Sequence, residues 1–279
     1  MKVSIIGLGL IGGSIARDLK SQINVTVYGV DNNPSHADQA LELGLVHEMK
    51  ELNEAVELSD VIIIAIPVNH IEDMLPKVLD QVKEHQTVID VGSTKEEICT
   101  AVQSHPKRNR FVAAHPLAGT EYSGPTAAIP RLFVDKKNII CDKHRSSPDA
   151  LETALKIFNS MGMKTYFLNP SEHDKHLAYV SHLSHVSSFM LGLTVLDIEK
   201  DERQIFNLAS TGFASTVRLA KSNPKTWAPI FEKNKQHLAT ALESYINYLT
   251  QFKEAIQSND VTSSRKLMQE ANDIKRILN

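Results

Sequence analysis

The chain has 279 residues, 42% of them hydrophobic and 23% charged, which is typical of a soluble globular protein with one large or two medium domains. The formal net charge of −3 gives no global attraction to nucleic acid or to an anionic membrane, so an anionic ligand needs locally placed cations. The two cysteines are too few for a disulfide framework and lack metal-site spacing. The N-terminus does not resemble a signal peptide, and the apolar segment 186–196 is too short to span a bilayer. We therefore expect a cytoplasmic protein that binds neither nucleic acid nor membrane.

Short β-branched runs alternate with helical patterns up to about residue 168. Several of these runs are apolar without alternation, as is typical of strands covered by helices on both faces. The pattern predicts an α/β fold with a doubly wound, mostly parallel sheet. The expected strands are 2–6, 24–30, 60–66, 87–91, 110–114, 137–141 and 164–168.

The strand signals end before Ser171. Residues 171–198 predict one long helix with Ser171 as its N-cap, and the apolar second half predicts burial. Because Asn169-Pro170 is a natural break, we expect a dinucleotide-binding domain over 1–168 and an all-helical domain over 169–279. Within the helical part, apolar residues at steps of seven, four and three predict a heptad-like stripe on one long helix, typical of a core or a dimer interface; these are Phe231, Leu238, Leu242, Tyr245, Leu249, Phe252 and Ile256.

The segment "GLGLIGGS" places Gly7, Gly9 and Gly12 in G-x-G-x-x-G spacing, after a strand and at the start of a helical pattern. That context indicates dinucleotide binding: the glycines allow a tight turn, a close approach to a pyrophosphate and close helix packing. The helix N-terminus then offers free N–H groups to the phosphates. The alternative is a tight turn with a purely structural role and no ligand. Adding the loop after the 60–66 strand, the expected cofactor contacts are Gly7, Leu8, Gly9, Leu10, Ile11, Gly12, Ile66, Pro67 and Ser93.

Asp31 follows the second expected strand, 19 residues after Gly12. A carboxylate at this place accepts hydrogen bonds from the adenosine ribose hydroxyls and repels a 2′-phosphate. Asn32 and Asn33 bring no cation to offset that repulsion, so Asp31 favours NAD over NADP. The alternative is that Asp31 only caps a turn before Pro34.

His115 lies in "AAHPLAGTEYSG" (113–124), in the loop we expect after the 110–114 strand. Ser93, in "DVGSTKEE", follows another strand at the same sheet edge, so His115, Ser93, Thr120 and Glu121 should converge near the nicotinamide. A neutral imidazole can accept the proton of an alcohol as hydride leaves its carbon. The alternative is a purely structural histidine.

The chain resembles the TyrA family, the prephenate and arogenate dehydrogenases of tyrosine biosynthesis. The resemblance is carried, in the family's order and spacing, by "GLGLIGGS", "DVGSTK", "HPLAGTEYSG", "SHLSH" and "STVRLAKSNPKTW". It implies a Rossmann-type domain followed by an all-α domain that forms a homodimer. It also implies an NAD-dependent prephenate dehydrogenase, an oxidoreductase that decarboxylates prephenate to 4-hydroxyphenylpyruvate.

The resemblance also implies residue roles. His115 matches the catalytic histidine that bonds the ring C4 hydroxyl, and Ser93 matches a serine that orients that hydroxyl. Arg218 matches the arginine that holds a substrate carboxylate, which suits the rigid guanidinium fork. The remaining substrate contacts would lie near the substrate side chain or shape the pocket: Thr120, Glu121, His185 and Trp227.

Three other functions stay open. Arogenate carries an amine in place of the side-chain keto group of prephenate, and His185 can hydrogen-bond to either. The chain could also be another NAD-dependent hydroxy-acid dehydrogenase. A non-catalytic dinucleotide-binding protein is the third alternative, against which His115, Ser93 and Arg218 argue.

The histidines of the second half suggest a metal site, but no cysteine or paired carboxylate completes a ligand set, so we expect no metal. They are His173, His176, His182 and His185. Some members of the family carry a mutase or regulatory domain, for which we expect no room before Asn279. If tyrosine inhibits, it should therefore enter the substrate pocket, with its phenol at His115 and Ser93.

Overall fold

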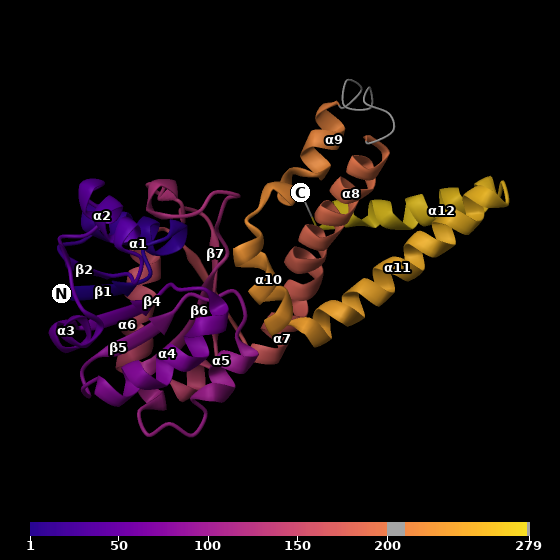
Figure 1. Cartoon of the computed structure of the whole chain (residues 1–279). Helices are drawn as coiled ribbons and strands as arrows, with labels where there is room; N and C mark the ends of the chain where they lie inside the picture. Colours follow the sequence, from indigo (N-terminus) through magenta and orange to yellow (C-terminus); the bar gives the residue numbers. More distant parts are fainter. Residues whose placement is uncertain (200–209, 278–279) are drawn as a thin grey trace. The chain divides into compact units, whose positions relative to one another are not determined.

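The computed structural model describes residues 1–199 and 210–277. Their strands form one sheet in the order β3-β2-β1-β4-β5-β6-β7-β8, and every neighbouring pair is parallel except β6 and β7 (Figure 1). Each expected strand is present within two residues, while the short β3 was not expected. The strands are β1 Lys2–Ile6, β2 Thr26–Val30, β3 Glu48–Met49, β4 Val61–Ile64, β5 Thr87–Asp90, β6 Phe111–Pro116, β7 Lys137–Cys141 and β8 Lys164–Leu168.

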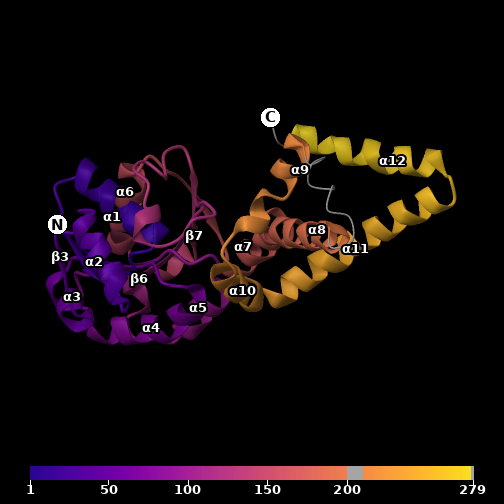
Figure 2. The same cartoon turned by 45° about the horizontal axis from the view of Figure 1, so that its top comes forward.

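Helices cover both faces of this sheet, as a doubly wound fold requires. They are α1 Leu10–Gln22, α2 Pro34–Glu42, α3 Leu52–Leu58, α4 Val68–Gln81, α5 Glu96–Ala101 and α6 Pro148–Ser160. Figure 2 shows α1 and α6 on one side of the sheet and α4 and α5 on the other. Neighbouring side chains of a strand point to opposite faces, so Ile63 joins one buried cluster while Ile62 and Ile64 join the other. The α/β fold class is confirmed.

The helix expected over 171–198 is interrupted. It consists of α7 Pro170–Leu177, a π-helical segment Ala178–His182 and α8 Leu183–Glu199. We expected Ser171 to be the N-cap of this helix, but the N-cap is Asn169. The Asn169 side chain accepts a hydrogen bond from the Glu172 N–H at 2.7 Å. Asparagine is a strong cap and Pro170 suits the first helical position, so the Asn-Pro pair begins the helix.

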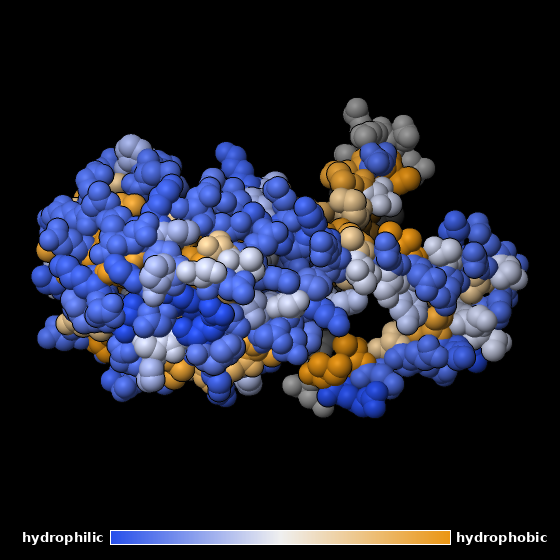
Figure 3. Space-filling view, turned by 90° about the horizontal axis from the view of Figure 1, so that it is seen from below, coloured by the Kyte–Doolittle hydropathy of each residue, from blue (hydrophilic) through white to orange (hydrophobic). Residues whose placement is uncertain are grey.

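The expected burial of α8 is wrong for its outer face. Its apolar side chains are between 38% and 54% exposed at Met190, Leu191, Leu193, Leu196 and Ile198. Figure 3 shows hydrophobic residues gathered where α8 ends, in contrast to the mostly hydrophilic surface of the sheet-containing part. An apolar sequence predicts that a helix face is covered, but it does not say whether the same chain covers it.

The described chain divides into two compact units, Met1–Asn234 and Lys235–Asn279. The first unit ends with α9 Thr211–Thr216, a 3₁₀ turn Arg218–Lys221 and α10 Pro224–Lys233. The second contains α11 Lys235–Gln257 and α12 Val261–Ala271, which contact each other. We expected the heptad-like stripe to lie on one helix, and this expectation is wrong. The helix breaks at Asn234, so Phe231 belongs to α10 and the rest of the stripe to α11. None of the described helices is both long and apolar enough to span a membrane.

Candidate active site

The glycine turn joins β1 to α1. Gly7 has φ +93°, and a Cβ there would lie 2.6 Å from the Ala65 carbonyl oxygen. A Cβ on Gly12 would lie 1.9 Å from the Gly7 oxygen, so the fold itself requires both glycines. A Cβ on Gly9 would meet nothing within 4 Å, and no side chain caps α1 at this residue. The free space and the uncapped N-terminus of a 13-residue helix fit a dinucleotide pyrophosphate.

Asp31 follows β2 and is fixed beside this turn. Its Oδ2 accepts a hydrogen bond from the Leu8 N–H at 2.9 Å, and its Oδ1 accepts one from the Asn33 N–H at 2.9 Å. Asp31 therefore also caps the turn before Pro34, which was the alternative to ribose binding. Each carboxylate oxygen keeps a further acceptor site, which leaves Asp31 able to bind ribose hydroxyls. His36, which the sequence analysis did not consider, lies with its Nδ1 3.7 Å from Oδ2.

His115 lies within β6 rather than in the loop that follows, which corrects our expectation. β6 continues to Pro116 because His115 pairs with Ile139 of the antiparallel strand β7. The side chain is 9% exposed, and its Nδ1 lies 2.8 Å from Nε2 of His173 on α7. The two imidazole rings meet edge to face. A strand holds the imidazole more firmly than a loop would.

His173 continues this contact to a carboxylate. Its Nδ1 lies 2.7 Å from Oδ1 of Asp174. Asp174 also accepts two backbone N–H groups, from Lys95 at 2.8 Å and from Glu96 at 2.9 Å. The β5–α5 loop that carries the half-buried Ser93 is thus linked to His115 through two side chains, those of Asp174 and His173.

The contacts of His173 and Asp174 with this centre were not predicted from the sequence. His173 was expected only as a possible metal ligand, and Asp174 was not singled out. The adjacent histidine and acid at the start of a helix were the available signal, but His115 and His173 are 58 residues apart. Sequence periodicity does not reveal such a long-range contact.

Burial controls protonation at this centre. Desolvation is the main cause that holds the pKa of His115 well below the usual value of an imidazole, and neighbouring groups lower it further: His173, Lys95 and His182. Burial also lowers the pKa of His173, although the hydrogen bond to Asp174 opposes that effect. His115 is therefore a neutral imidazole near pH 7, which is the form that accepts a proton.

A buried ion pair organises the Ser93 loop from the other side. Lys95 Nζ bonds Oδ2 of Asp90, and both side chains are fully buried. The Gly92 N–H donates to the same oxygen at 2.9 Å. With Lys95 held at its ammonium and its backbone N–H, the segment 90–96 has one defined path past His115.

The structure brings together three residues that we expected to be substrate contacts: His185, Trp227 and Arg218. The His185 ring stacks on Trp227 with centroids 3.3 Å apart. Burial lowers the pKa of His185, and Arg218 is close enough to lower it further. His185 Nδ1 lies 3.0 Å from the Ser181 carbonyl oxygen, which can only accept, so Nδ1 carries the proton.

Contacts connect this aromatic group to the His115 centre. The His182 ring meets Trp227 edge to face, and its Nδ1 lies 3.0 Å from Nδ2 of Asn234. The same nitrogen of Asn234 donates to the Asp174 carbonyl at 2.7 Å. Burial lowers the pKa of His182 to about 4. Among the described residues, no three histidine, cysteine or acidic side chains are placed to share a metal ion.

The helix that carries Trp227 is fastened to the nucleotide-binding part. Lys233, at the end of α10, forms ion pairs with Glu72 of α4 at 2.9 Å and Glu97 of α5 at 3.0 Å. The hydrogen bond to Glu72 is the main cause that raises the pKa of Lys233 to about 12. Trp227 therefore keeps a defined position relative to the sheet.

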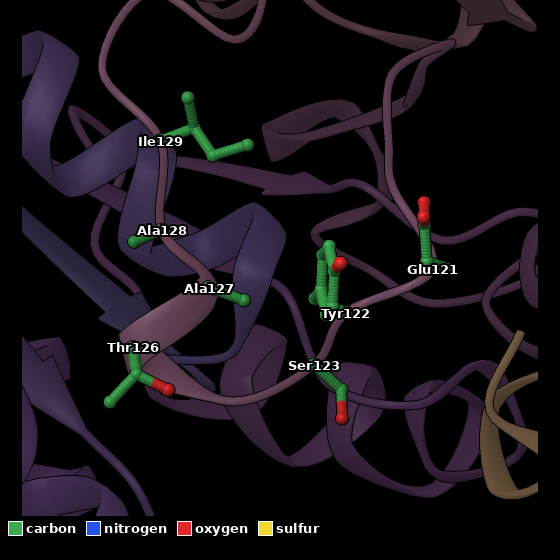
Figure 4. A pocket seen from close by; sticks show the side chains of 7 residues that line it. All are labelled: Glu121, Tyr122, Ser123, Thr126, Ala127, Ala128 and Ile129. Carbon is green, nitrogen blue, oxygen red and sulfur yellow. The ribbon is translucent and has the colours of Figure 1, made fainter.

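Thr120 and Glu121 lie in the loop after β6. Thr120 Oγ1 accepts a hydrogen bond from the Tyr122 N–H at 3.3 Å, and Asn223 Nδ2 donates to Ser123 Oγ at 3.2 Å. A surface pocket of about 520 Å³ is lined by Glu121, Tyr122, Ser123, Thr126, Ala127, Ala128 and Ile129. Figure 4 shows Tyr122 between Glu121 and the 126–129 side of the pocket. His115 and Ser93 are not among its lining residues, so the pocket marks the rim and not the reacting centre.

The backbone beyond this pocket packs against α1. The Ile129 N–H donates to Ser14 Oγ at 3.0 Å, and the Arg131 N–H donates to Asp18 Oδ1 at 2.7 Å. A Cβ on Gly13 would lie 3.0 Å from the Ala128 side chain. The pocket thus borders the first turns of the helix whose N-terminus fits the pyrophosphate.

Comparisons with known proteins agree with this arrangement. The family model "Prephenate dehydrogenase, nucleotide-binding domain" matches residues 15–167, and "Prephenate dehydrogenase, dimerization domain" matches residues 169–270. The cyclohexadienyl dehydrogenase of Zymomonas mobilis is 30% identical, over 92% of this chain and 89% of that protein. The prephenate dehydrogenase of Bacillus subtilis is 28% identical, over 98% of this chain and 75% of that protein.

Solved structures extend the similarity to the whole chain. The crystal structure of Aquifex aeolicus prephenate dehydrogenase with hydroxyphenyl propionate and NAD+ has a TM-score of 0.90 and 28% identity, covering 100% of this chain and 98% of that one. Synechocystis arogenate dehydrogenase has a TM-score of 0.80 and 29% identity, with both chains covered completely.

Proposed function

This chain belongs to the prephenate dehydrogenase family and is an NAD-dependent dehydrogenase, and we propose that His115 is the base with which it oxidises prephenate to 4-hydroxyphenylpyruvate. One observation carries the proposal. A buried imidazole is held on β6 near the carboxyl ends of the parallel strands, the edge at which the glycine turn after β1 also lies. Ligands of such sheets bind at that edge.

The cofactor would be held by the glycine turn and by Asp31. The N–H groups at the start of α1 suit the pyrophosphate, and the Asp31 carboxylate suits the ribose hydroxyls. When bound, NAD supplies the hydride acceptor. We assign the other cofactor contacts on sequence position: Gly7, Leu8, Gly9, Leu10, Ile11, Gly12, Ile66, Pro67 and Ser93.

His115 receives the proton of the C4 hydroxyl while hydride leaves the same carbon. The C4–O bond becomes a carbonyl, and this carbonyl draws electrons from the bond between C1 and its carboxylate. Carbon dioxide leaves, the ring becomes aromatic, and the phenolate oxygen at C4 takes the proton back from His115 to give the phenol. Ser93, in the loop that Asp174 ties to this centre, would orient the hydroxyl. The aromatic ring supplies the driving force of the decarboxylation.

The second carboxylate of the substrate would bind Arg218. The guanidinium is exposed beside the His185–Trp227 stack, which leaves its donor fork available. Thr120, Glu121 and Trp227 would enclose the rest of the side chain. Removal of this clamp should weaken binding more than the chemical step.

Arogenate is a second candidate substrate, and the tautomer of His185 favours it. With its proton on Nδ1, a neutral His185 presents Nε2 as an acceptor. The ammonium of arogenate is a donor, whereas the keto oxygen of prephenate is an acceptor. Similar proteins include the arogenate dehydrogenase of Synechocystis and a probable arogenate/prephenate dehydrogenase of Methanocaldococcus jannaschii.

The exposed apolar face of α8 supports a homodimer, as does the family description of the matching segment as a dimerization domain. The boundary between residues 168 and 169 would then separate the nucleotide-binding domain from the dimer-forming part. The cytoplasmic location and competitive inhibition by tyrosine also stay proposals.

One assay tests the function. NADH formation is followed at 340 nm with prephenate and with arogenate, each with NAD+ and with NADP+. Turnover of prephenate with stoichiometric carbon dioxide release supports the proposal. Absence of turnover with both substrates refutes it, and turnover of arogenate alone makes the second candidate the function.

A further inference from the structure

Two residues next to the proposed base form a continuous polar path. His115 Nδ1 and His173 Nε2 lie 2.8 Å apart, and His173 Nδ1 and Asp174 Oδ1 lie 2.7 Å apart. His173 has no exposed surface and Asp174 is 1% exposed, so water does not compete for these contacts. Hydrogen bonds inside such a low-dielectric region are stronger than those at a surface.

We propose that His173 and Asp174 form a proton relay that directs the lone pair of His115 toward the substrate hydroxyl and receives positive charge during the reaction. This inference rests on the proposed function of His115 as the base. His173 and Asp174 are positioning residues in this scheme, because they act through His115 and do not touch the substrate.

The direction of the relay follows from the donors around Asp174. Both of its carboxylate oxygens accept backbone N–H groups, from Lys95 and Glu96, so the carboxylate faces donors. His173 must then donate from Nδ1, which leaves its Nε2 as an acceptor in the neutral ring. His115 donates to that acceptor from Nδ1. The free lone pair of His115 is therefore on Nε2, on the side of the ring away from His173.

The relay also stabilises the positive charge that His115 gains when it takes up the proton. Positive or titratable groups around His115 come from three neighbouring segments: Lys95 after β5, His173 on α7 and His182 in the π-helical segment. Lys95 is already neutralised by Asp90. Asp174 contacts His173 directly, so a positive charge is best stabilised on His173.

The proton movement balances. The hydroxyl O–H bond of the substrate breaks, and an N–H bond forms at His115 Nε2. The Nδ1–H bond of His115 breaks, and an N–H bond forms at His173 Nε2. The hydride would leave with its electron pair to the bound cofactor. The protein then holds an imidazolium at His173 against the Asp174 carboxylate until the phenolate at C4 takes the proton back through His115.

The competing explanation is structural. Asp174 accepts the N–H groups at the start of α5, and Asn234 holds its carbonyl, so the residue also stabilises the packing of α7. A loss of activity on substitution does not by itself separate the two explanations. A pH profile does, because only the relay places the Asp174 charge in contact with the catalytic proton.

The test uses Asp174→Asn and His173→Gln in the full chain, with Glu172→Gln and His176→Gln as matched controls. The controls remove an exposed acid and an exposed histidine from the same helix. We expect kcat of Asp174→Asn to fall by roughly 10²–10⁴-fold, the range for disabling a base or its orienting carboxylate. NADH binding and the controls should stay within about twofold of wild type. Loss of the carboxylate destabilises the imidazolium, so the acid limb of the kcat profile should move to lower pH.

Two results would overturn the relay: a folded Asp174→Asn enzyme with kcat within about threefold of wild type, or a large loss of kcat with the acid limb unmoved. If wild type turns over neither substrate, or if His115→Asn keeps full activity, the proposed function has failed instead. Nitrogen-15 NMR of labelled histidines then tests the relay without activity. The relay requires the proton of His115 and of His173 on Nδ1, and a proton on Nε2 of either neutral ring contradicts it.

Discussion

Gly9 and Gly12 belong to one motif, yet their replacement by alanine should have opposite consequences. A Cβ on Gly9 enters open space, and the residue has φ −69°, which alanine adopts readily. The loss of a favourable cap and the gain in chain stiffness are each a few tenths to 1 kcal/mol with opposite signs, so the free energy of unfolding should change by less than about 0.5 kcal/mol. A Cβ on Gly12 would overlap the Gly7 oxygen at 1.9 Å, so α1 must move by about 1 Å. Overpacking of this kind costs about 1–3 kcal/mol or more.

NADH binding should respond to Gly9→Ala although the stability of the fold does not. In Gly9→Ala the new methyl group occupies the space that the pyrophosphate needs, so we expect NADH to bind at least about tenfold more weakly, equivalent to about 1.4 kcal/mol. Urea unfolding without ligand and NADH fluorescence titration measure the two effects separately. Gly212→Ala, where a Cβ makes only an ordinary contact, is the control. Wild-type NADH affinity in a stable Gly9→Ala protein would falsify the placement of the pyrophosphate at Gly9.

Four further predictions concern the chemical step, the cofactor, the substrate carboxylate and the assembly. His115→Asn should lower kcat by about 10²–10⁴-fold with the fold intact, and near-wild-type kcat removes His115 from the mechanism. Asp31→Ser with Asn32→Arg should narrow the preference for NAD+ over NADP+ in kcat/KM; a wild-type enzyme that already uses both equally contradicts the Asp31 argument. Arg218→Ala should raise KM more than it lowers kcat, while light scattering should give a dimer at micromolar concentration; an unchanged KM or a monomer argues against the respective proposal.

The sheet could be predicted because its strands are short apolar runs separated by turn residues. The two-residue strand β3 has no such run, since its Glu48 and Met49 are exposed or half-buried at the sheet edge. The helical half was harder. Sequence periodicity did not reveal the π-helical segment, and hydropathy indicated that α8 is apolar without showing that its outer face is uncovered in this chain.

In the candidate site, too, residues fixed by local sequence could be predicted, whereas contacts between distant segments could not. Gly7, Gly12 and Asp31 could be identified because local spacing and one strand end determine their positions. His115 could be proposed from its sequence motif, but its place within β6 depends on pairing with β7, which local sequence does not encode. The contacts of Asp174 with Lys95 and of His173 with His115 join distant segments, so they needed the folded chain.

The π-helical segment at Ala178–His182 has a consequence for how this chain can change. Each residue of an α-helix turns the chain by about 100°, so the single extra residue of a π turn sets the angular phase of all that follows. Upstream of it, His173 contacts β6 and Asp174 contacts the start of α5. Downstream, His185 stacks on Trp227, and Met190 and Leu193 are exposed. Deleting one residue here would leave both helices intact but rotate α8 by roughly a quarter turn relative to α7. One deletion would thereby change the orientation of His185 and of the exposed apolar face of α8 relative to His173 and Asp174.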